Sequence, residues 1–316
     1  MKRLGVIGTM VWDTIHGRDP SMGPIDEWGG IAYALAALEA ELPNGWEIVP
    51  LIKVGRDLAP RANEFLGCLT KRSAADRFVE VTEPNNRVTL RYTSATRRTE
   101  QLSGGVPGWS WEELGPLIHD VDAIYVNFIS GFELQLETLQ YLRHGFGGPI
   151  YTDLHSLLLG VAPTGLRVPR PLVDGAKWFP CFDVVQVNED EISLLGPDPM
   201  AVAAHALNIG VRLLVVTLGD RGAVYFTVPP FDLMNRTSTH LAGPIYSALI
   251  EAPSMPPDCD PTGCGDVFGG TLISRLLDEE PLEAAIHHAN RLAARNLTHK
   301  GATNLQYHLR GQIAPR

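Results

Sequence analysis

The sequence predicts an α/β protein whose central sheet is largely parallel. Short apolar runs rich in β-branched residues recur along the chain, as expected of strands buried on both faces. Segments with helical patterns lie between several of these runs, and this alternation is typical of βαβ units. The chain has 316 residues, of which 45% are hydrophobic and 20% are charged, so it can bury a large core.

The predicted elements follow one another without internal repeats or low-complexity segments. Six apolar runs are predicted as buried strands, at residues 4–7, 48–52, 123–126, 150–152, 184–187 and 213–218. Helical patterns cover residues 31–42, 134–143, 200–208 and 271–277. We therefore expect a single domain over residues 1–316.

Two segments depart from this rhythm. Residues 87–93 alternate polar and apolar side chains, which predicts a half-exposed strand of a separate small sheet. Together with the loop-like stretch 14–26, this strand fits a lid beside the main domain, built from segments near 14–28 and 82–106. The pattern alone is equally consistent with a plain edge hairpin.

Charge and composition exclude several classes of function. The formal net charge is −10 and no Lys/Arg-rich run occurs, which argues against binding to nucleic acid. No stretch approaches 18 uninterrupted apolar residues, and the N-terminal apolar run is too short for a signal peptide. We expect a cytoplasmic protein without membrane contact.

The four cysteines are Cys68, Cys181, Cys259 and Cys264. They form no C-x-x-C pair and no zinc-ligand spacing, so reduced thiols are expected.

The segment with the clearest chemistry is 260–270, Asp-Pro-Thr-Gly-Cys-Gly-Asp-Val-Phe-Gly-Gly, directly before the helical pattern 271–277. Its glycines allow consecutive backbone N–H groups to converge at a helix N-terminus, which suits a phosphate or a developing oxyanion. Asp266 lies in the first turn, where a carboxylate beside an anion site suggests a proton acceptor. On spacing alone, an ordinary first-turn acidic residue is an equal alternative.

Two other glycine-rich motifs do not fit this segment. In a Rossmann fingerprint the third glycine would come one residue before Gly269, and the motif would follow the first strand of its βαβ unit. A Walker A sequence, G-x-x-x-x-G-K-S/T, is absent from the chain.

The segment Asp260-Pro-Thr-Gly-Cys-Gly-Asp266 resembles the D-T-x-G-A-G-D signature of the ribokinase-like (PfkB-type) carbohydrate and nucleoside kinases. Other blocks resemble motifs of the same family, in the same order, from about residue 4 to residue 302. They are Gly8-x-x-x-x-Asp13, Gly29-Gly30, Val54-Gly55-Arg56-Asp57, Asn188-x-x-Glu191, Thr217-Leu218-Gly219-x-x-Gly222 and Thr298-His299-Lys300-Gly301-Ala302. The resemblance implies a ribokinase-like fold with a small β lid.

The resemblance also implies roles at the phosphate end of the site. Asp266 would be the catalytic base of an ATP-dependent kinase, and the N–H groups of Gly263, Cys264 and Gly265 would hold the γ-phosphoryl group. Asn188 and Glu191 would organise Mg²⁺ through water, although a helix N-cap by Asn188 is the structural alternative.

Further residues would contact the nucleotide or a second ion. Thr217, Gly219 and Gly222 belong to the motif that lies beside the nucleotide in the family. Asn290 matches a position near adenine, with a merely solvated helix position as the alternative. In many members the loops around Asp260 and Thr262 bind a monovalent cation such as K⁺, which makes these two residues candidate cation ligands.

At the substrate end, Asp13 would accept hydrogen bonds from hydroxyl groups of a sugar or related polyol, and Gly29 and Gly30 would let the backbone approach it. The chain departs here from the common pattern: Ala34, beside Tyr33, replaces a substrate-contacting Asn. A nucleoside kinase is therefore the alternative. A non-catalytic metabolite-binding protein is less expected, since Asp266 is retained.

The chain departs from the family pattern at two further positions. Asp153-Leu-His155 stands where many relatives have D-x-N, and Cys264 replaces the common Ala without removing a backbone N–H. Lid strands of this family often pair across a homodimer, which makes a homodimer through the lid an expectation for this chain.

Overall fold

The computed structural model describes residues 1–17, 23–74, 78–92, 98–235, 243–254 and 259–314. Its main sheet has the strand order β14-β13-β12-β11-β8-β7-β1-β3-β4. Neighbouring strands from β12 to β4 run parallel, and β13 and β14 are antiparallel to the strand beside them. The strands are β1 (Lys2–His16), β3 (Trp46–Gly55), β4 (Val79–Val81), β7 (Ala123–Asn127), β8 (Ile150–Asp153), β11 (Val184–Asn188), β12 (Leu213–Thr217), β13 (Ala223–Thr227) and β14 (Tyr246–Ile250).

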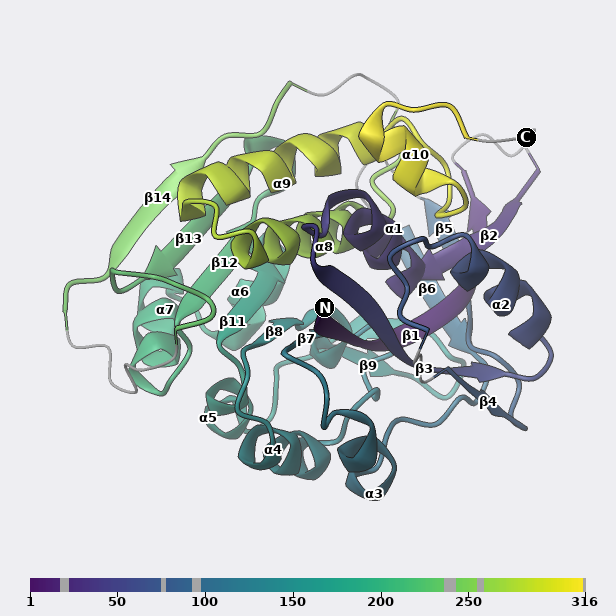
Figure 1. The fold of residues 1–316 in the computed structure, drawn as a ribbon, viewed down its shortest axis with the longest axis horizontal. Coiled ribbons are helices and arrows are strands. Elements are labelled where there is room, and N and C mark those ends of the chain that lie inside the picture. Colours follow the sequence, from purple (N-terminus) through teal and green to yellow (C-terminus); the bar gives the residue numbers. More distant parts are fainter. Residues whose placement is uncertain (18–22, 75–77, 93–97, 236–242, 255–258, 315–316) are drawn as a thin grey trace.

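Helices cover both faces of this sheet (Figure 1). On one face lie α1 (Ile31–Glu41), α8 (Cys264–Leu277), α9 (Leu282–Asn296) and α10 (Leu305–Arg310). On the other face lie α3 (Trp111–Leu114), α4 (Leu136–Gly145), α5 (Gly175–Trp178), α6 (Glu189–Leu195) and α7 (Pro199–Asn208). Successive strand residues enter two separate apolar clusters, one under each set of helices. The short helix α2 (Ala59–Gly67) follows β3.

The sequence-predicted elements are confirmed, with shifted boundaries. All six apolar runs are strands of the main sheet, which fits the near-continuous hydrophobic pattern of parallel strands. The helix expected over 271–277 begins earlier, at Cys264, because the glycine turn ends at Gly263. The antiparallel strands β13 and β14 were not predicted.

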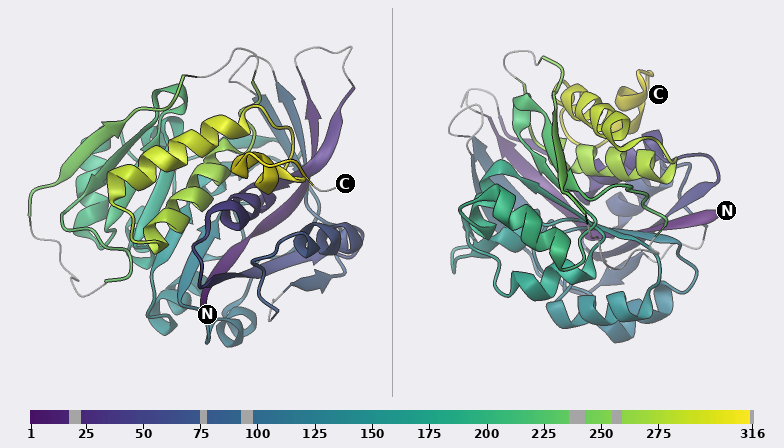
Figure 2. Two further views of the ribbon diagram at one scale, coloured as in Figure 1. Left: turned by 45° about the horizontal axis from the view of Figure 1, so that its top comes forward. Right: turned by 90° about the vertical axis from the view of Figure 1, so that its left-hand side faces the viewer.

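β1 also belongs to a second, smaller sheet. Its last residues pair antiparallel with β2 (Ile25–Gly30) and parallel with β5 (Arg87–Tyr92), and β5 pairs antiparallel with β6 (Arg98–Ser103). These strands extend beyond the helical layers at one end of the molecule (Figure 2). The expectation of a loop over 14–26 was wrong at both ends, because Thr14 to His16 continue β1 and β2 starts at Ile25. Residues 18–22 and 93–97 of the expected lid lie outside the described residues.

Two smaller expectations can be compared with the structure. All four cysteines are free thiols. Over the described part of the chain, no helix combines the length and apolarity needed to cross a membrane.

The short strands β9 (Leu159–Val161) and β10 (Arg167–Pro169) form a separate hairpin.

Candidate active site

The glycine turn before α8 has the geometry of an anion site. Gly263 caps the helix with φ +76°, and a Cβ there would lie 2.3 Å from the Tyr33 ring, so only glycine fits. Gly265 is exposed, and among the described residues its N–H and that of Gly263 make no backbone hydrogen bond. The Cys264 N–H was predicted to belong to the same anion hole. In the structure it donates instead to the Pro261 carbonyl at 3.2 Å. Two of the three expected N–H groups are therefore free.

Asp266 lies in the first turn of α8, directly after Gly265. Its carboxylate accepts a hydrogen bond from the Asn127 side chain at 2.7 Å. Burial raises the pKa of Asp266 to about 6, against the opposing effects of Asn127, His155 and Arg98. Such a carboxyl is ionised at neutral pH and is a stronger base than an exposed aspartate.

Two polar residues that were not predicted as site residues, Asn127 and Gln186, contact this turn. Asn127, Asp153 and Asn188 end the parallel strands β7, β8 and β11, so they meet at one edge of the sheet. Gln186 donates to the Asp153 carboxylate at 2.8 Å and to the Gly265 carbonyl at 3.0 Å. A signal was present in the sequence, since Asn127 and Asp153 each come directly after a predicted buried strand.

Asn188 and Glu191 form a capping box at the start of α6. The Asn188 side chain accepts from the Glu191 N–H at 2.9 Å, and the Glu191 carboxylate accepts from the Asn188 N–H at 2.8 Å. The other Glu191 oxygen pairs with His155 at 2.7 Å. Burial opposes protonation of His155, but Glu191, Glu100 and Asp153 raise its pKa to about 9. The structural alternative considered for Asn188 is therefore realised.

This arrangement fits Mg²⁺ only through water. Both Glu191 carboxylate oxygens already accept hydrogen bonds, and over the described residues no cluster of three or more His, Cys, Asp or Glu side chains could hold a metal directly. Magnesium retains several waters in such sites, so a carboxylate one water away is a chemically suitable partner.

The residues expected at the nucleotide lie at the end of β12, in the turn between β12 and β13, and on α9. Thr217 is the last residue of β12, and Gly219 (φ +62°) starts the turn after it. Gly222 has φ +100°, and a Cβ there would lie 2.1 Å from the Ile250 carbonyl oxygen. The Asn290 side chain donates to that same carbonyl at 2.8 Å. Asn290 is thus occupied in anchoring β14 instead of being solvated.

At the substrate end, Asp13 and Gly29 face each other across β1 and β2. A Cβ on Gly29 would lie 1.8 Å from an Asp13 carboxylate oxygen, which explains the glycine. Gly30, with φ +58°, caps α1. Asp13 is 4% exposed, and its carboxyl group makes no hydrogen bond within the described chain. Burial raises its pKa to about 8. Burying a carboxyl group without a hydrogen-bond partner is unfavourable in free energy. A ligand hydroxyl that hydrogen-bonds to Asp13 would therefore be stabilised.

Asp260 and Thr262, the candidate cation ligands, bond to each other and to the small sheet. One Asp260 oxygen accepts from the N–H and the hydroxyl of Thr262, at 2.9 and 2.6 Å. The Tyr92 hydroxyl lies 3.2 Å from the same oxygen and 2.6 Å from the Thr262 hydroxyl. In the structure these residues join β5 to the loop before α8.

Charged side chains of β6 influence the pKa of both Asp13 and Asp266, and Arg167 of β10 also influences that of Asp13. Arg98 donates to Glu100 at 2.8 Å and to the Tyr92 hydroxyl at 3.1 Å. Arg167 lies 3.6 Å from Glu100. Burial would raise the pKa of Glu100, but Arg98, His155 and Arg167 lower it to about 2. This network was missed because Arg98 and Glu100 lie in no recognised motif.

Tyr33 and Ala34 are both buried residues of α1. Tyr33 is 1% exposed with its ring against Gly263, and Ala34 is fully buried. The substitution that suggested a nucleoside substrate is therefore a packing feature of α1.

Comparison with known proteins gives a family match for part of the sequence and structural matches for the fold. Residues 165–308 match the model of the pfkB family carbohydrate kinases. This segment belongs to the pfkB family, and the chain has the ribokinase-like fold. The fold is shared with a ribokinase from Thermotoga maritima, with a TM-score of 0.69 and 18% identity over 98% of this chain and 99% of that one. A pyrophosphate-dependent kinase in the ribokinase family superposes with a TM-score of 0.72 and 16% identity, over 97% and 98% of the two chains.

Curated relatives match this chain over a shorter range. Fructokinase-1 of Oryza sativa subsp. japonica is 32% identical over 130 residues, which are 38% of this chain and 35% of that protein. Probable fructokinase-3 of Arabidopsis thaliana is 26% identical over the same length and covers 33% of its own chain. The match thus spans about a third of the length of these relatives.

Proposed function

We propose that the chain is a kinase that transfers the γ-phosphoryl group of ATP to a hydroxyl group of a sugar or related polyol. The observation that carries the proposal is Asp266, a partly buried carboxylate with a pKa of about 6, at the N-terminus of α8, where two N–H groups make no backbone hydrogen bond among the described residues. The similarity to fructokinases and the pfkB-family match support the carbohydrate class.

In this mechanism the acceptor hydroxyl lies between Asp13 and Asp266. Asp13 accepts hydrogen bonds from neighbouring hydroxyl groups and orients the substrate. Asp266 removes the proton from the attacking hydroxyl as the bond to phosphorus forms. The free N–H groups of Gly263 and Gly265 stabilise the negative charge that develops on the transferred group.

Two further groups complete the donor side. Glu191 and Asn188 would hold Mg²⁺ through its water shell, and the bound ion would supply charge neutralisation at the donor phosphates. Thr217 and Gly219 lie beside the donor. Closure of the small sheet over the substrate excludes water, with Tyr92 as its contact to the loop before α8. Asp260 and Thr262 are kept as candidate ligands of K⁺, to be tested by comparing activity in K⁺ and Na⁺ salts.

The test is phosphorylation of a panel of sugars, polyols and nucleosides by purified protein with ATP and Mg²⁺. We expect turnover of a sugar or polyol, and a fall of about 10² to 10⁴-fold in kcat for Asp266→Asn. Glu137→Asn, on exposed α4, should be without effect. No turnover across the panel, or full activity of Asp266→Asn, would reject the proposal.

The same assay separates the alternatives. A nucleoside kinase would give turnover and thermal stabilisation with nucleosides but not with free sugars. A structural neighbour is the nucleoside kinase of Burkholderia thailandensis, solved with inosine, but at 18% identity it shows only the fold. Pyrophosphate should be tried beside ATP, because the Asn290 side chain is already bonded to backbone. A non-catalytic metabolite-binding protein would give stabilisation without turnover.

A further inference from the structure

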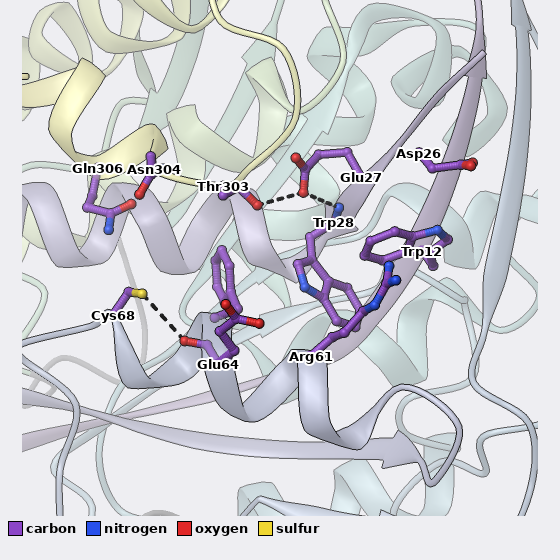
Figure 3. A pocket seen from close by; sticks show the side chains of 11 residues that line it. Trp12, Asp26, Glu27, Trp28, Arg61, Glu64, Cys68, Thr303, Asn304 and Gln306 are labelled. Carbon is purple, nitrogen blue, oxygen red and sulfur yellow. Dashed lines mark hydrogen bonds between the residues drawn. The ribbon is translucent and has the colours of Figure 1, made fainter. Parts of the chain in front are cut away.

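A second pocket lies outside the candidate active site, on the other side of the β1–β2 pair. It has a volume of about 510 Å³, within the range of small-molecule sites. Its walls come from β1, β2, α2 and the start of α10 (Figure 3). No residue of the candidate active site lines it.

Strand geometry separates this pocket from the substrate end. Trp12 lines the pocket, whereas its neighbour Asp13 faces Gly29. Adjacent strand residues point to opposite faces, so the two sites share β1 without sharing side chains. Trp28 pairs with Trp12 in the same way and is followed by Gly29.

An arginine side chain of the protein itself lies over the aromatic wall of the pocket. Trp12 and Trp28 meet edge to face, with ring centroids 5.1 Å apart. The Arg61 guanidinium lies 4.8 Å from the centroid of the Trp12 ring. The indole face therefore presents the electron-rich surface that attracts planar cations.

Hydrogen-bond acceptors predominate around this wall. The carboxylates of Asp26, Glu27 and Glu64 line the pocket against the single positive charge of Arg61. The Glu64 carboxylate has no hydrogen bond or ion pair among the described residues. An N–H-rich cation would complement both the charge and the acceptors.

We propose that this pocket binds an organic cation, an amidinium, guanidinium or primary ammonium group carried on a flat or apolar body. The aromatic wall contacts the body and the face of the cation, and the carboxylates accept its N–H groups. This site is independent of the kinase reaction proposed above, and binding can be measured without turnover.

Benzamidine is the probe, with benzamide and benzoate as neutral and anionic analogues of the same shape. Binding is followed by the indole N–H signals of Trp12 and Trp28 in two-dimensional NMR spectra, assigned with Trp→Phe variants. We expect benzamidine to shift both signals with a dissociation constant of about 1 mM, as suits so small a ligand. Benzamide should bind more weakly, and benzoate should leave the signals unchanged.

Two substitutions should act in opposite directions. Glu64→Gln removes a carboxylate and should weaken benzamidine binding about threefold, while Glu137→Gln on distant α4 should not change it. Arg61→Gln removes the competing cation from Trp12 and should strengthen binding. Equal affinity for all three probes, shifts confined to other tryptophans, or weaker binding by Arg61→Gln would each overturn the proposal.

Discussion

Asp266 and Asn127 together set the ionisation of the proposed base. Asp266 must be deprotonated to accept a proton, so kcat/KM should fall as the pH drops through about 6 and level off above it. The Asn127 N–H stabilises the carboxylate and lowers its pKa. Asn127→Leu should therefore move the acidic limb of the pH–rate profile upward, by about one pH unit. If the acidic limb of the pH–rate profile did not move, Asn127 would have no effect on the pKa of Asp266.

Asp13 connects substrate binding to stability. Burial raises its pKa from 3.8 to about 8, so between about pH 4 and pH 8 the unfolded chain loses this proton while the folded chain keeps it. The wild-type protein should thus lose stability across this window, by up to about 1.4 kcal/mol per pH unit.

Asp13→Asn removes this loss. Urea unfolding at pH 5 and pH 8 should show the variant gaining stability relative to wild type as the pH rises, while its KM for the acceptor increases. A stability difference independent of pH would contradict the raised pKa.

At the scale of elements, the glycine turn before α8 allows a matched comparison. Gly263→Ala forces a Cβ at φ +76° into the Tyr33 ring and should destabilise the fold by about 1 to 3 kcal/mol. At Gly265, a Cβ meets no atom closer than 3.9 Å. Gly265→Ala should therefore keep stability within about 0.5 kcal/mol, yet lower kcat because its methyl group lies at the exposed N–H groups. Urea unfolding and steady-state kinetics check the pair, and equal losses of stability would contradict it.

Much at this scale could be predicted from sequence. Apolar runs located the parallel strands because both their faces are buried. Glycines located the turn before α8, where at Gly263 no other residue fits. The pattern could not show that Cys264 N–H is bonded to Pro261, or that Tyr33 packs on Gly263, since both depend on how distant segments meet. The Arg98–Glu100 pair could not be predicted from the sequence either, because a buried charge is recognised only once its partner is known.

At the scale of the whole molecule, Tyr92 joins the small sheet to the loop before α8 through Asp260 and Thr262. Tyr92→Phe removes these bonds and the one from Arg98. We expect faster hydrogen exchange in β5 and β6 and a several-fold higher KM for the acceptor, with global stability lowered by only about 1 kcal/mol. Tyr246→Phe, on the exposed strand β14, is the control. Unchanged exchange in β5 and β6 would exclude this coupling.

The homodimer expected through the small sheet belongs to the same scale. It stays a prediction that sedimentation of the purified protein can check. In a monomer, described residues of the loop before β10 would still contact the edge of β6: the Gly165 carbonyl accepts from the Leu102 N–H, and the Thr164 carbonyl accepts from the Gln101 side chain.

β1 runs without interruption from the main sheet into the small one, and this continuity makes its residue count critical. Deleting one residue between Ile7 and Trp12 would leave the core half of the strand in place but turn every later side chain to the opposite face. Trp12 would then face Gly29 and Asp13 would enter the second pocket. Insertions or deletions in the loops after the strands should therefore be tolerated far better than within β1. Within β1 the number of residues determines on which face of the strand the Asp13 carboxylate lies.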